Sequence, residues 1–378
     1  MKPKHILFLS SWYPSRLRPF AGDFVQRHAW AASRLNQISV LHAAKQENLG
    51  QVYEVDVKEG IIKEVVVYYK HSWFRPLNYL RRLIALKKGL KQIEDFHLVH
   101  LNVTYPAGIF ALYLKFFKHK KYVITEHWTG FREDLFRQFP ALERWVIKLI
   151  LKNSERLLPV SHHLGKSMQS VSGNKSFEVI PNVIDTDLFV PDLNLYEKKI
   201  CRFLHLSNLK SDHKNILGML NVAKRLADEQ FQFEFHIGGN GSLKEIEKFI
   251  ADNHLELQIQ VFGTLQYNEV PAKMNAYDCF VLFSNYENQP CVQTESYSCG
   301  VPFIGSDVGG IPEFLPEGFG IIVRKGNEDD LYEAMKEVIN GKKFASKEAM
   351  HQYARNHFSY ETIARRFDEV YKQVLNES

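Results

Sequence analysis

Residues 284–313 read SNYENQPCVQTESYSCGVPFIGSDVGGIPE and place two glutamates, Glu287 and Glu295, eight positions apart on either side of Pro290. Proline suits the first turn of a helix, so the stretch predicts a helix that starts at this proline. A glycine pair follows at 309–310, and glycine lets a backbone come close to a ligand. The stretch therefore predicts a ligand site where a loop leads into a helix.

The predicted helix start indicates which ligand would bind. The first backbone amides, those of Cys291 and Val292, have no partner within the helix and form a site for an anion. Glu295 lies roughly 7 Å behind the helix start, at 1.5 Å of rise per residue, and Glu287 lies on the loop before it. The two carboxylates would flank a phosphate and accept hydrogen bonds from hydroxyls on both sides, which suits a sugar nucleotide. The alternative is that both glutamates are solvated surface residues.

The rest of the chain predicts two α/β domains in tandem. Short apolar strands alternate with helical stretches, which is typical of a parallel sheet covered on both faces. We expect a first domain over 1–190, a polar linker over 190–199, a second domain over 198–357, and a C-terminal helix over 358–378 that crosses back to the first. Strands are expected at 5–9, 38–43, 97–103, 121–126, 156–161, 177–182, 201–207, 231–238, 259–265, 279–284, 301–306 and 320–325, with a hairpin at 54–69 and helices that include 23–35, 77–93 and 360–375.

Charge is unevenly spread along the 378 residues. Residues 1–190 carry 28 Lys and Arg against 16 Asp and Glu, a net charge of +12, whereas the whole chain carries +5. The excess is strongest over 70–121, where eleven basic side chains oppose Glu94 and Asp95. Such a half could face nucleic acid, an anionic lipid surface or an acidic small molecule, or could simply be solvated. The basic helix at 77–93 could lie on anionic lipid, but packing on the sheet is the simpler interpretation.

The sequence also indicates a compartment and a cofactor requirement. The N-terminal apolar run ILFL, 6–9, is too short for an export signal or a membrane span. The four cysteines form no CxxC pair, so we expect a protein of the reducing cytoplasm, at most peripheral at the inner face of a membrane. We expect no acidic pair that holds a divalent ion on a diphosphate, and therefore no metal requirement and no cofactor.

The stretch 284–313 resembles the signature of the retaining glycosyltransferases called family 4, or glycosyl transferases group 1, whose E-x7-E motif matches Glu287 and Glu295. The resemblance implies the GT-B fold, in which two Rossmann-like, doubly wound parallel-sheet domains face a cleft that binds a sugar nucleotide. Relatives usually have alanine after the second acid, where this chain has Ser296, and NQP stands after the first acid. Both acids and Pro290 stay in register.

Other segments resemble the same family over most of the chain. Gly22 in PFAGDF matches the glycine loop that approaches the donor phosphates, and His127 in ITEHW matches a strand-end histidine beside the donor sugar. Gly239 in HIGGNGS and Gly263 in VFGTL match glycines of the donor cleft. Each match has a plainer alternative, because glycine also marks simple turns and a strand-end histidine is often a structural group.

The main departure from the family lies at 204–215, LHLSNLKSDHKN. Asn208 stands where relatives often have an arginine that binds the diphosphate. Lys214 keeps the place of the diphosphate-binding lysine, with one residue inserted, and Lys210 could supply the missing charge. The alternative is that both lysines are solvated at a helix start.

The resemblance implies transfer of a hexosyl or acetamidohexosyl group from a UDP- or GDP-sugar to an acceptor hydroxyl with retained configuration, in bacterial surface polysaccharide or lipid-linked glycan synthesis. The residues expected to act in catalysis are Glu287, His127 and Lys214. The donor-binding set comprises Gly22, Asn208, Lys210, Gly239, Gly263, Pro290, Cys291, Val292 and Glu295. The candidates for acceptor contacts, at strand ends of the first domain, are Trp12, Tyr13 and Trp128.

Two other interpretations stay open. Asn208 gives some weight to a sugar-nucleotide-binding subunit without activity. A glycosidase would use Glu287 and Glu295 as acid and nucleophile about 5 Å apart, and the phosphate-type loops argue against it. The expected partners are a nucleotide-sugar donor and a glycan or lipid-linked acceptor, with an anionic membrane surface as a further candidate and no nucleic acid.

Overall fold

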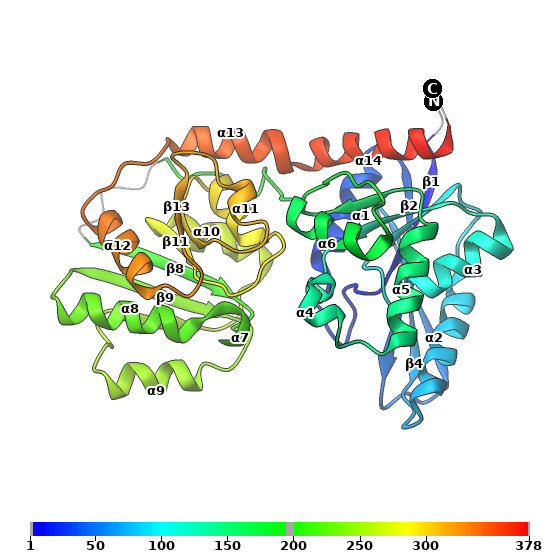
Figure 1. Ribbon diagram of the computed structural model, residues 1–378, viewed down its shortest axis with the longest axis horizontal. Helices are drawn as coiled ribbons and strands as arrows, with labels where there is room; N and C mark the ends of the chain where they lie inside the picture. The colour runs from blue at the N-terminus through cyan, green and yellow to red at the C-terminus, as the bar shows by residue number, and fades with distance from the viewer. Residues whose placement is uncertain (1–2, 194–199, 210, 377–378) are drawn as a thin grey trace. The chain divides into compact units, whose positions relative to one another are not determined.

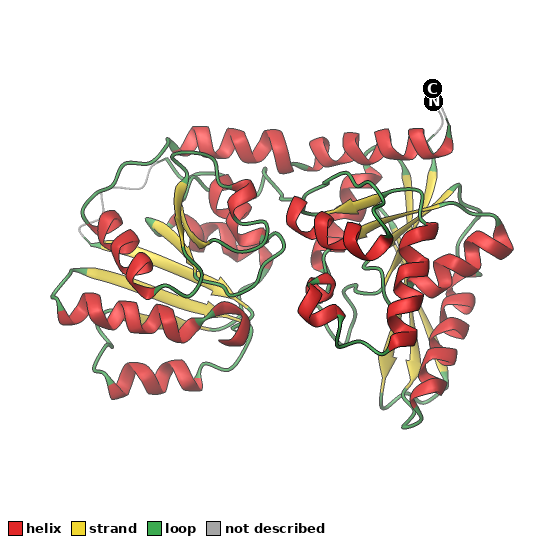
Figure 2. Cartoon of the chain, viewed as in Figure 1, coloured by secondary structure: helices red, strands yellow, loops and turns green. Residues whose placement is uncertain are grey.

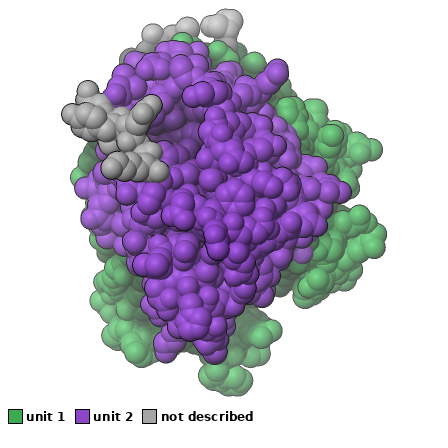
Figure 3. Space-filling view, turned by 90° about the vertical axis from the view of Figure 1, so that its left-hand side faces the viewer, with its two compact units in different colours: residues 1–183, 360–378 green, residues 184–359 purple. Residues whose placement is uncertain are grey.

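The computed structural model describes residues 3–193, 200–209 and 211–376. The chain divides into two compact units, which Figure 3 colours separately: unit 1 comprises 1–183 and 360–378, and unit 2 comprises 184–359. Each unit is an α/β layer structure with a parallel or mainly parallel sheet between helices (Figures 1 and 2). The expected tandem of two parallel-sheet domains is therefore confirmed.

The sheet of unit 1 has the strand order β3-β4-β2-β1-β5-β6-β7. β3 and β4 form an antiparallel hairpin, and the other neighbours are parallel. The central strands are short runs of apolar residues, which suits strands buried on both faces. The strands are β1 (His5–Ser10), β2 (Gln37–Gln46), β3 (Tyr53–Glu59), β4 (Lys63–Lys70), β5 (Leu98–Asn102), β6 (Tyr122–Glu126) and β7 (Leu157–Pro159).

Helices cover both faces of this sheet and form two cores. Alternate residues of β1 point to opposite faces, so Leu7 and Leu9 join one core while Ile6 and Phe8 join the other. The first core includes α2 (Arg75–Leu90), α3 (Gly108–Lys118), α5 (Ala141–Asn153) and α6 (His162–Ser172), with η1 (Thr129–Phe131) and α4 (Glu133–Phe136) at its edge. The second core includes α1 (Asp23–Ser33) and α14 (Tyr360–Leu375).

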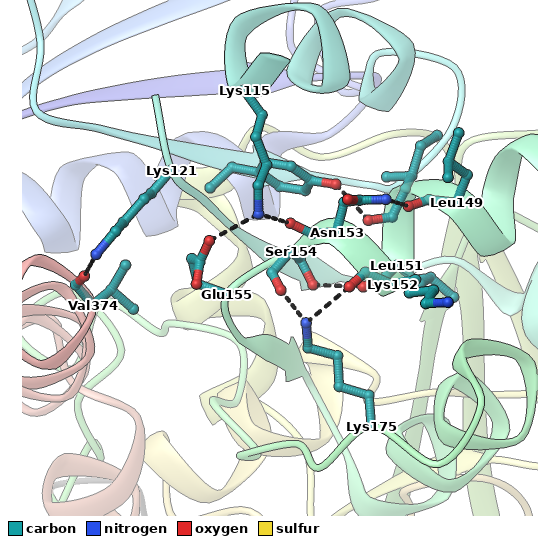
Figure 4. Close-up of polar contacts among 12 residues, drawn as sticks. Lys115, Lys121, Leu149, Leu151, Lys152, Asn153, Ser154, Glu155, Lys175 and Val374 are labelled. Atoms are coloured by element: carbon teal, nitrogen blue, oxygen red, sulfur yellow. Dashed lines mark hydrogen bonds and ion pairs between the residues drawn. The ribbon is translucent and has the colours of Figure 1, made fainter. Parts of the chain in front are cut away.

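The C-terminal helix α14 is an integral part of unit 1. Phe367 and Tyr371 are fully buried in the second core, and the Tyr371 hydroxyl lies 2.6 Å from Nδ1 of His100 on β5. Figure 4 shows a further link, in which the Lys121 ammonium donates to the carbonyl of Val374 at 2.7 Å. Nearby, Lys115 donates to Asn153 and Glu155, and Lys175 donates to the carbonyl of Ser154, so lysines tie this end of the sheet to its helices.

Unit 2 contains a fully parallel sheet of strand order β10-β9-β8-β11-β12-β13. The strands are β8 (Cys201–Ser207), β9 (Phe233–Gly239), β10 (Ile259–Phe262), β11 (Cys279–Leu282), β12 (Phe303–Ser306) and β13 (Gly320–Val323). One face packs on α8 (Ile216–Asp228), α9 (Lys244–Asp252) and α12 (Glu328–Ile339). The other packs on α10 (Val270–Asn275), α11 (Cys291–Ser298) and α13 (Lys347–Phe358), and the short helices are α7 (Ser211–Lys214), η2 (Tyr267–Glu269) and η3 (Pro312–Phe314).

Two details differ from the sequence predictions. The strand expected at 177–182 forms only a single bridge, between Leu157 and Phe177. The amides of Glu178 and Ile180 donate to the carbonyls of Leu157 and Pro159, but Pro159 has no amide with which to continue the ladder. The boundary expected at 190 lies at 183, because Ile184 and Phe189 are fully buried in the core of unit 2. Across the described residues, no helix is both long and apolar enough to span a bilayer.

Candidate functional site

The sheet of unit 2 has a change of winding direction between β8 and β11. From β8 the chain passes through α8 to β9 on one side, whereas β11 lies against the other side of β8. Open α/β sheets bind ligands outside the carboxyl ends of the strands at such a switch point. The segments that follow β8 and β11, which carry Lys214 and Glu287, therefore lie where a ligand is expected (Figure 1).

Lys214 and Glu287 form an ion pair across this switch point. Their side chains are only 14% and 11% exposed, and Ser284 donates to the same carboxylate oxygen of Glu287 at 2.8 Å. The two segments are also joined through their backbones, since the amide of Asn285 donates to the carbonyl of His213 at 2.7 Å. The structure thus brings together two predicted site residues that are 73 positions apart, and neither is a solvated surface group.

The predicted helix is α11, which begins at Cys291 with Pro290 as its N-cap in an extended conformation. The amides of Cys291 and Val292 open the helix, as the sequence predicted, and both residues are half-buried. Glu295 lies in the second turn and is 5% exposed. Burial raises the pKa of the Cys299 thiol one turn later, and the charge of Glu295 raises it further. Glu295 is therefore a buried group and not a solvated one.

The predicted glycines of unit 2 follow the carboxyl ends of its strands. Gly239 ends β9 against Ser207, and Gly263 follows β10 with open space around it. Gly309, which the sequence showed only as part of a glycine pair, packs directly on Glu287. Its φ is +57°, and a Cβ there would lie 1.6 Å from the Glu287 carbonyl oxygen, so only glycine allows this approach.

The loop after β8 is described in part. Asn208 is exposed and follows Ser207, whose hydroxyl accepts from the amide of Leu209 at 3.1 Å. Lys210 lies outside the described residues. His205 on β8 is fully buried and hydrogen-bonds Ser207 and the carbonyl of Val281; burial lowers its pKa to about 4.

In unit 1, His127 lies directly after β6 in an aromatic cluster. Its ring is 4.4 Å from the ring of Phe24 and 5.1 Å from that of His28. Burial holds the pKa of His127 well below its usual value, and the charge of His28 lowers it further. The imidazole is therefore neutral near pH 7, and it can exchange a hydrogen bond but carries no charge.

Glu126, the residue before His127, is a site residue that the sequence interpretation missed. Its side chain is fully buried, and its carboxylate accepts amides of Thr104, His127 and Trp128, each at 2.8 Å. Burial raises the pKa of Glu126 while these hydrogen bonds oppose the rise. The Glu126 carboxylate thus fixes the loops after β5 and β6. The sequence signal for this role is a charged residue at the end of an apolar strand.

Gly22 is the left-handed N-cap of α1, with φ at +76°. A Cβ at Gly22 would lie 2.6 Å from the carbonyl carbon of Trp12, so this glycine holds the loop after β1 close to its own start. Trp12 is 38% exposed and available for contact. Tyr13 is buried and donates to Glu64, and the ring of Trp128 packs on Phe131 and Phe139.

Among the described residues, no group of three or more His, Cys, Asp and Glu is arranged to hold an ion. A literal D-x-D does occur at Asp185 and Asp187, which the sequence interpretation did not consider. Asp185 accepts the amides of Asp187 and Leu188 and so caps a turn.

Two families match the chain: Glycosyltransferase Family 4 over residues 21–188 and Glycosyl transferases group 1 over residues 191–357. The chain belongs to these glycosyltransferases. This glycosyltransferase is 24% identical to an uncharacterized glycosyltransferase of Methanocaldococcus jannaschii, over 96% of this chain and 97% of the relative. It is 23% identical to an N-acetyl-alpha-D-glucosaminyl L-malate synthase of Bacillus anthracis, over 92% of this chain and 91% of the relative.

Solved structures share the fold. The glycosyltransferase matches a sucrose-phosphate synthase of Thermosynechococcus elongatus with a TM-score of 0.80 at 18% identity, over all of both chains. It matches Anabaena HepE in complex with UDP-glucose with a TM-score of 0.73 at 16% identity, over 98% of this chain and 100% of HepE. The GT-B fold expected from the sequence is thus confirmed.

Proposed function

We propose that this glycosyltransferase transfers a sugar from a nucleoside diphosphate sugar to an acceptor hydroxyl and retains the anomeric configuration. The observation that carries the proposal is the Lys214–Glu287 pair at the switch point of unit 2. An ion pair that is largely buried costs desolvation unless both partners are satisfied. A pair placed at a ligand-binding edge is suited to exchange partners when a charged ligand arrives.

The donor diphosphate would compete with Glu287 for Lys214. The ammonium then holds phosphate oxygens, and the released carboxylate accepts a hydrogen bond from a hydroxyl of the donor sugar. The first amides of α11, at Cys291 and Val292, add a second anion contact. Glu295, one turn further on, accepts the ribose hydroxyls. In this arrangement the two carboxylates bind hydroxyls on either side of the diphosphate, and neither carboxylate contacts a phosphate.

The reaction would proceed on one face of the sugar. The bond between the anomeric carbon and the diphosphate oxygen breaks, the acceptor oxygen bonds the same face, and the acceptor proton passes to the leaving diphosphate. Lys214 and the α11 amides stabilise the negative charge that develops on the diphosphate, and Glu287 stabilises the positive charge on the sugar. In unit 1, neutral His127 is suited to a hydrogen bond with the donor sugar, and Gly22 allows a close backbone approach to the phosphates.

UDP-sugars are the first donors to test. HepE was solved with UDP-glucose, and several relatives are named as phosphatidylinositol N-acetylglucosaminyltransferases. We therefore infer a hexosyl or acetamidohexosyl donor. The purified protein should release UDP from UDP-glucose or UDP-N-acetylglucosamine, with GDP-mannose as the comparison, and NMR of a transferred product should show the donor's anomeric configuration.

The same assay tests the alternative of a non-catalytic binding subunit, which the exposed Asn208 favours. If the protein binds UDP but neither hydrolyses a UDP-sugar nor transfers its sugar to any acceptor tested, the result would support a non-catalytic binding subunit. Failure of UDP, GDP and their sugars to raise the melting temperature would reject both functions, because a ligand at 100 times its Kd adds about 2.7 kcal/mol of stability.

We also propose that the acceptor is membrane-associated, and exposed aromatic residues are further candidates for contact with the lipid. The basic side chains of α2 make contacts within the protein, since Arg81 donates to backbone carbonyls and Lys87 and Lys88 lie over tyrosine rings, but both lysines stay exposed. Exposed aromatic residues offer a second lipid surface, because tryptophan favours the membrane interface. Trp73 is 90% exposed and Trp145 is 59% exposed.

These tryptophans belong to neighbouring segments, because Tyr79 of α2 donates to Glu143 of α5 at 3.1 Å. We expect Trp73→Ala/Trp145→Ala to reduce pelleting with phosphatidylglycerol vesicles severalfold, since each aromatic ring buries apolar surface. Leu257→Ala, at an 86% exposed position of unit 2, is the matched control. Equal pelleting of both variants and the wild type would contradict this surface.

A further inference from the structure

Unit 1 contains a basic pocket of about 360 Å³ at the carboxyl ends of β1 and β2. Its walls come from the loop after β1, the end of β2, α2 and the loop after β5. Arg18, Lys45 and Arg82 line it from three of these segments, and none of the described lining residues is an aspartate or a glutamate. The pocket therefore gathers positive charge from distant parts of the sequence.

The basic side chains of this pocket form no ion pairs among the described residues. Within the described part of the chain, neither Arg18 nor Lys45 has a carboxylate partner. Arg82 is held in place by the hydroxyl of Tyr69, which accepts from its guanidinium at 3.1 and 3.2 Å. By contrast, Arg16 on the same loop is paired with Glu54 and donates to Gln46. Charges left without partners in a concave site attract an anion.

His42 adds a neutral hydrogen-bonding group to the same pocket. Its Nδ1 lies 2.9 Å from the carbonyl oxygen of Ser10, so Nδ1 must carry the proton and donate. Burial lowers the pKa of His42 to about 4, the hydrogen bond to Ser10 opposes this, and the charge of Arg82 lowers it further. The uncharged ring leaves Nε2 as an acceptor, which suits a hydroxyl of the ligand.

The pocket adjoins the residues assigned to the donor in unit 1. Trp12 and Ala21 line it, and Ala21 precedes Gly22. The ring of Trp12 is 6.4 Å from that of Phe24, which in turn is 4.4 Å from His127. The rings of Trp12 and Phe24 therefore connect the basic pocket to the histidine that we assign to the donor sugar.

We propose that this pocket binds the acceptor through a negatively charged group, a phosphate, diphosphate or carboxylate. Arg18, Lys45 and Arg82 hold the anion, and His42 accepts from a hydroxyl of the same molecule. This inference rests on the proposed function, since it assigns the acceptor class of the same reaction. The anion could belong to a phosphorylated or lipid-linked acceptor or to a small hydroxy acid, and the shared chemistry is the anion beside a hydroxyl.

Titration calorimetry with inorganic pyrophosphate and with succinate tests the pocket directly. We expect Arg18→Gln/Lys45→Gln to weaken binding of the preferred anion about 10-fold or more, because each lost contact is a hydrogen bond to a charged group. Both side chains are exposed, so the substitutions leave the core intact. The matched control, Lys91→Gln/Lys118→Gln, removes the same charge at exposed positions outside the pocket and should bind like the wild type.

Lys214→Gln separates this site from the donor site. It should weaken UDP binding and leave the pocket-dependent part of anion binding in place, whereas Arg18→Gln/Lys45→Gln should bind UDP normally. Preference for pyrophosphate indicates a phosphate-bearing acceptor, and preference for succinate indicates a carboxylate. Equal anion affinity of the pocket variant, its control and the wild type overturns the inference. Absence of UDP and GDP binding in the wild type instead rejects the proposed function.

Discussion

The two units share a parallel α/β sheet but treat charge in opposite ways at its carboxyl edge. In unit 2, Lys214 and Glu287 meet across the switch point and neutralise each other. In unit 1, Arg18, Lys45 and Arg82 line a pocket that has no acid among its described residues. Either partner of an ion pair can release the other and bind a ligand of opposite charge, whereas a set of positive charges selects an anion. The difference indicates two separate tasks on one architecture.

Their histidines differ as well. Unit 1 buries His28, His42 and His100 and half-buries His127. All four have lowered pKa values, and aromatic rings surround three of them. Unit 2 buries His205 in a similar state. A buried imidazole stays neutral in the folded state and binds a proton more readily in the unfolded state, so acid favours unfolding. Unit 1 should therefore be the more sensitive of the two units to acid.

The largest expected effect is therefore a loss of stability in unit 1 as the pH falls. The pKa of His28 and His42 is about 4 in the folded protein and 6.5 when unfolded, so the unfolded chain binds more protons between these values. Stability is complete above pH 6.5 and declines down to about pH 4, by ~3 kcal/mol for each histidine. Hydrogen exchange at pH 7 and pH 5, corrected for intrinsic rates, should show unit 1 losing protection first.

A substitution sharpens this test. His28→Gln should reduce the slope of unfolding free energy against pH by up to about 1.4 kcal/mol per pH unit. Greater loss of protection in unit 2 than in unit 1 at pH 5 would contradict the claim that the histidines make unit 1 the more acid-sensitive unit.

Removing one partner of the ion pair comes next. Lys214→Ala leaves the Glu287 carboxylate largely buried without its cation, which costs about 3–5 kcal/mol for a buried pair, and it should abolish tight UDP binding. Adding Glu287→Gln to this variant should recover part of the stability but not the UDP affinity. Urea unfolding and calorimetry measure the two effects, and a stable Lys214→Ala protein with unchanged UDP affinity would contradict the assigned role.

Substitutions of Glu287, on the loop before α11, and Glu295, within α11, should then change different kinetic constants. Glu287→Gln should lower kcat on the order of 10²-fold, because its charge opposes that of the sugar in the transition state. Glu295→Ala should mainly raise KM for the donor and weaken UDP binding, since ribose contacts act equally in ground and transition states. Steady-state kinetics with UDP titration decides the matter; the reverse pattern would mean that the donor lies the other way round.

The smallest expected effect concerns Glu126 in unit 1. Glu126→Gln keeps one accepting oxygen but turns an amide toward a backbone N–H, so a buried donor loses its partner at about 1–3 kcal/mol. Because the carboxylate positions the backbone at His127, kcat should fall while UDP affinity stays unchanged. Asp134→Asn, which loses an exposed ion pair with Arg132, is a suitable control and should alter neither quantity.

The sequence could predict the tandem sheets because apolar strands such as HILFL, 5–9, repeat in alternation with helices. Glu287 and Glu295 could be placed because their spacing is local to one loop and helix. The Lys214–Glu287 pair could not be derived from spacing, since it depends on β8 and β11 being neighbours in the sheet. The basic pocket was hidden for the same reason: its cations come from a loop, a strand and a helix far apart in the chain.

The position of α14 has a consequence for how the protein is made. Unit 2 is one continuous segment, 184–359, whereas the core of unit 1 requires Phe367 and Tyr371 from the last helix. As the ribosome delivers the chain from its amino end, residues 1–183 emerge first but lack part of their own interior. Unit 2 can therefore complete its fold while the earlier-made unit 1 still exposes the apolar face that α14 will cover. The segment that is synthesised first is the one that finishes last.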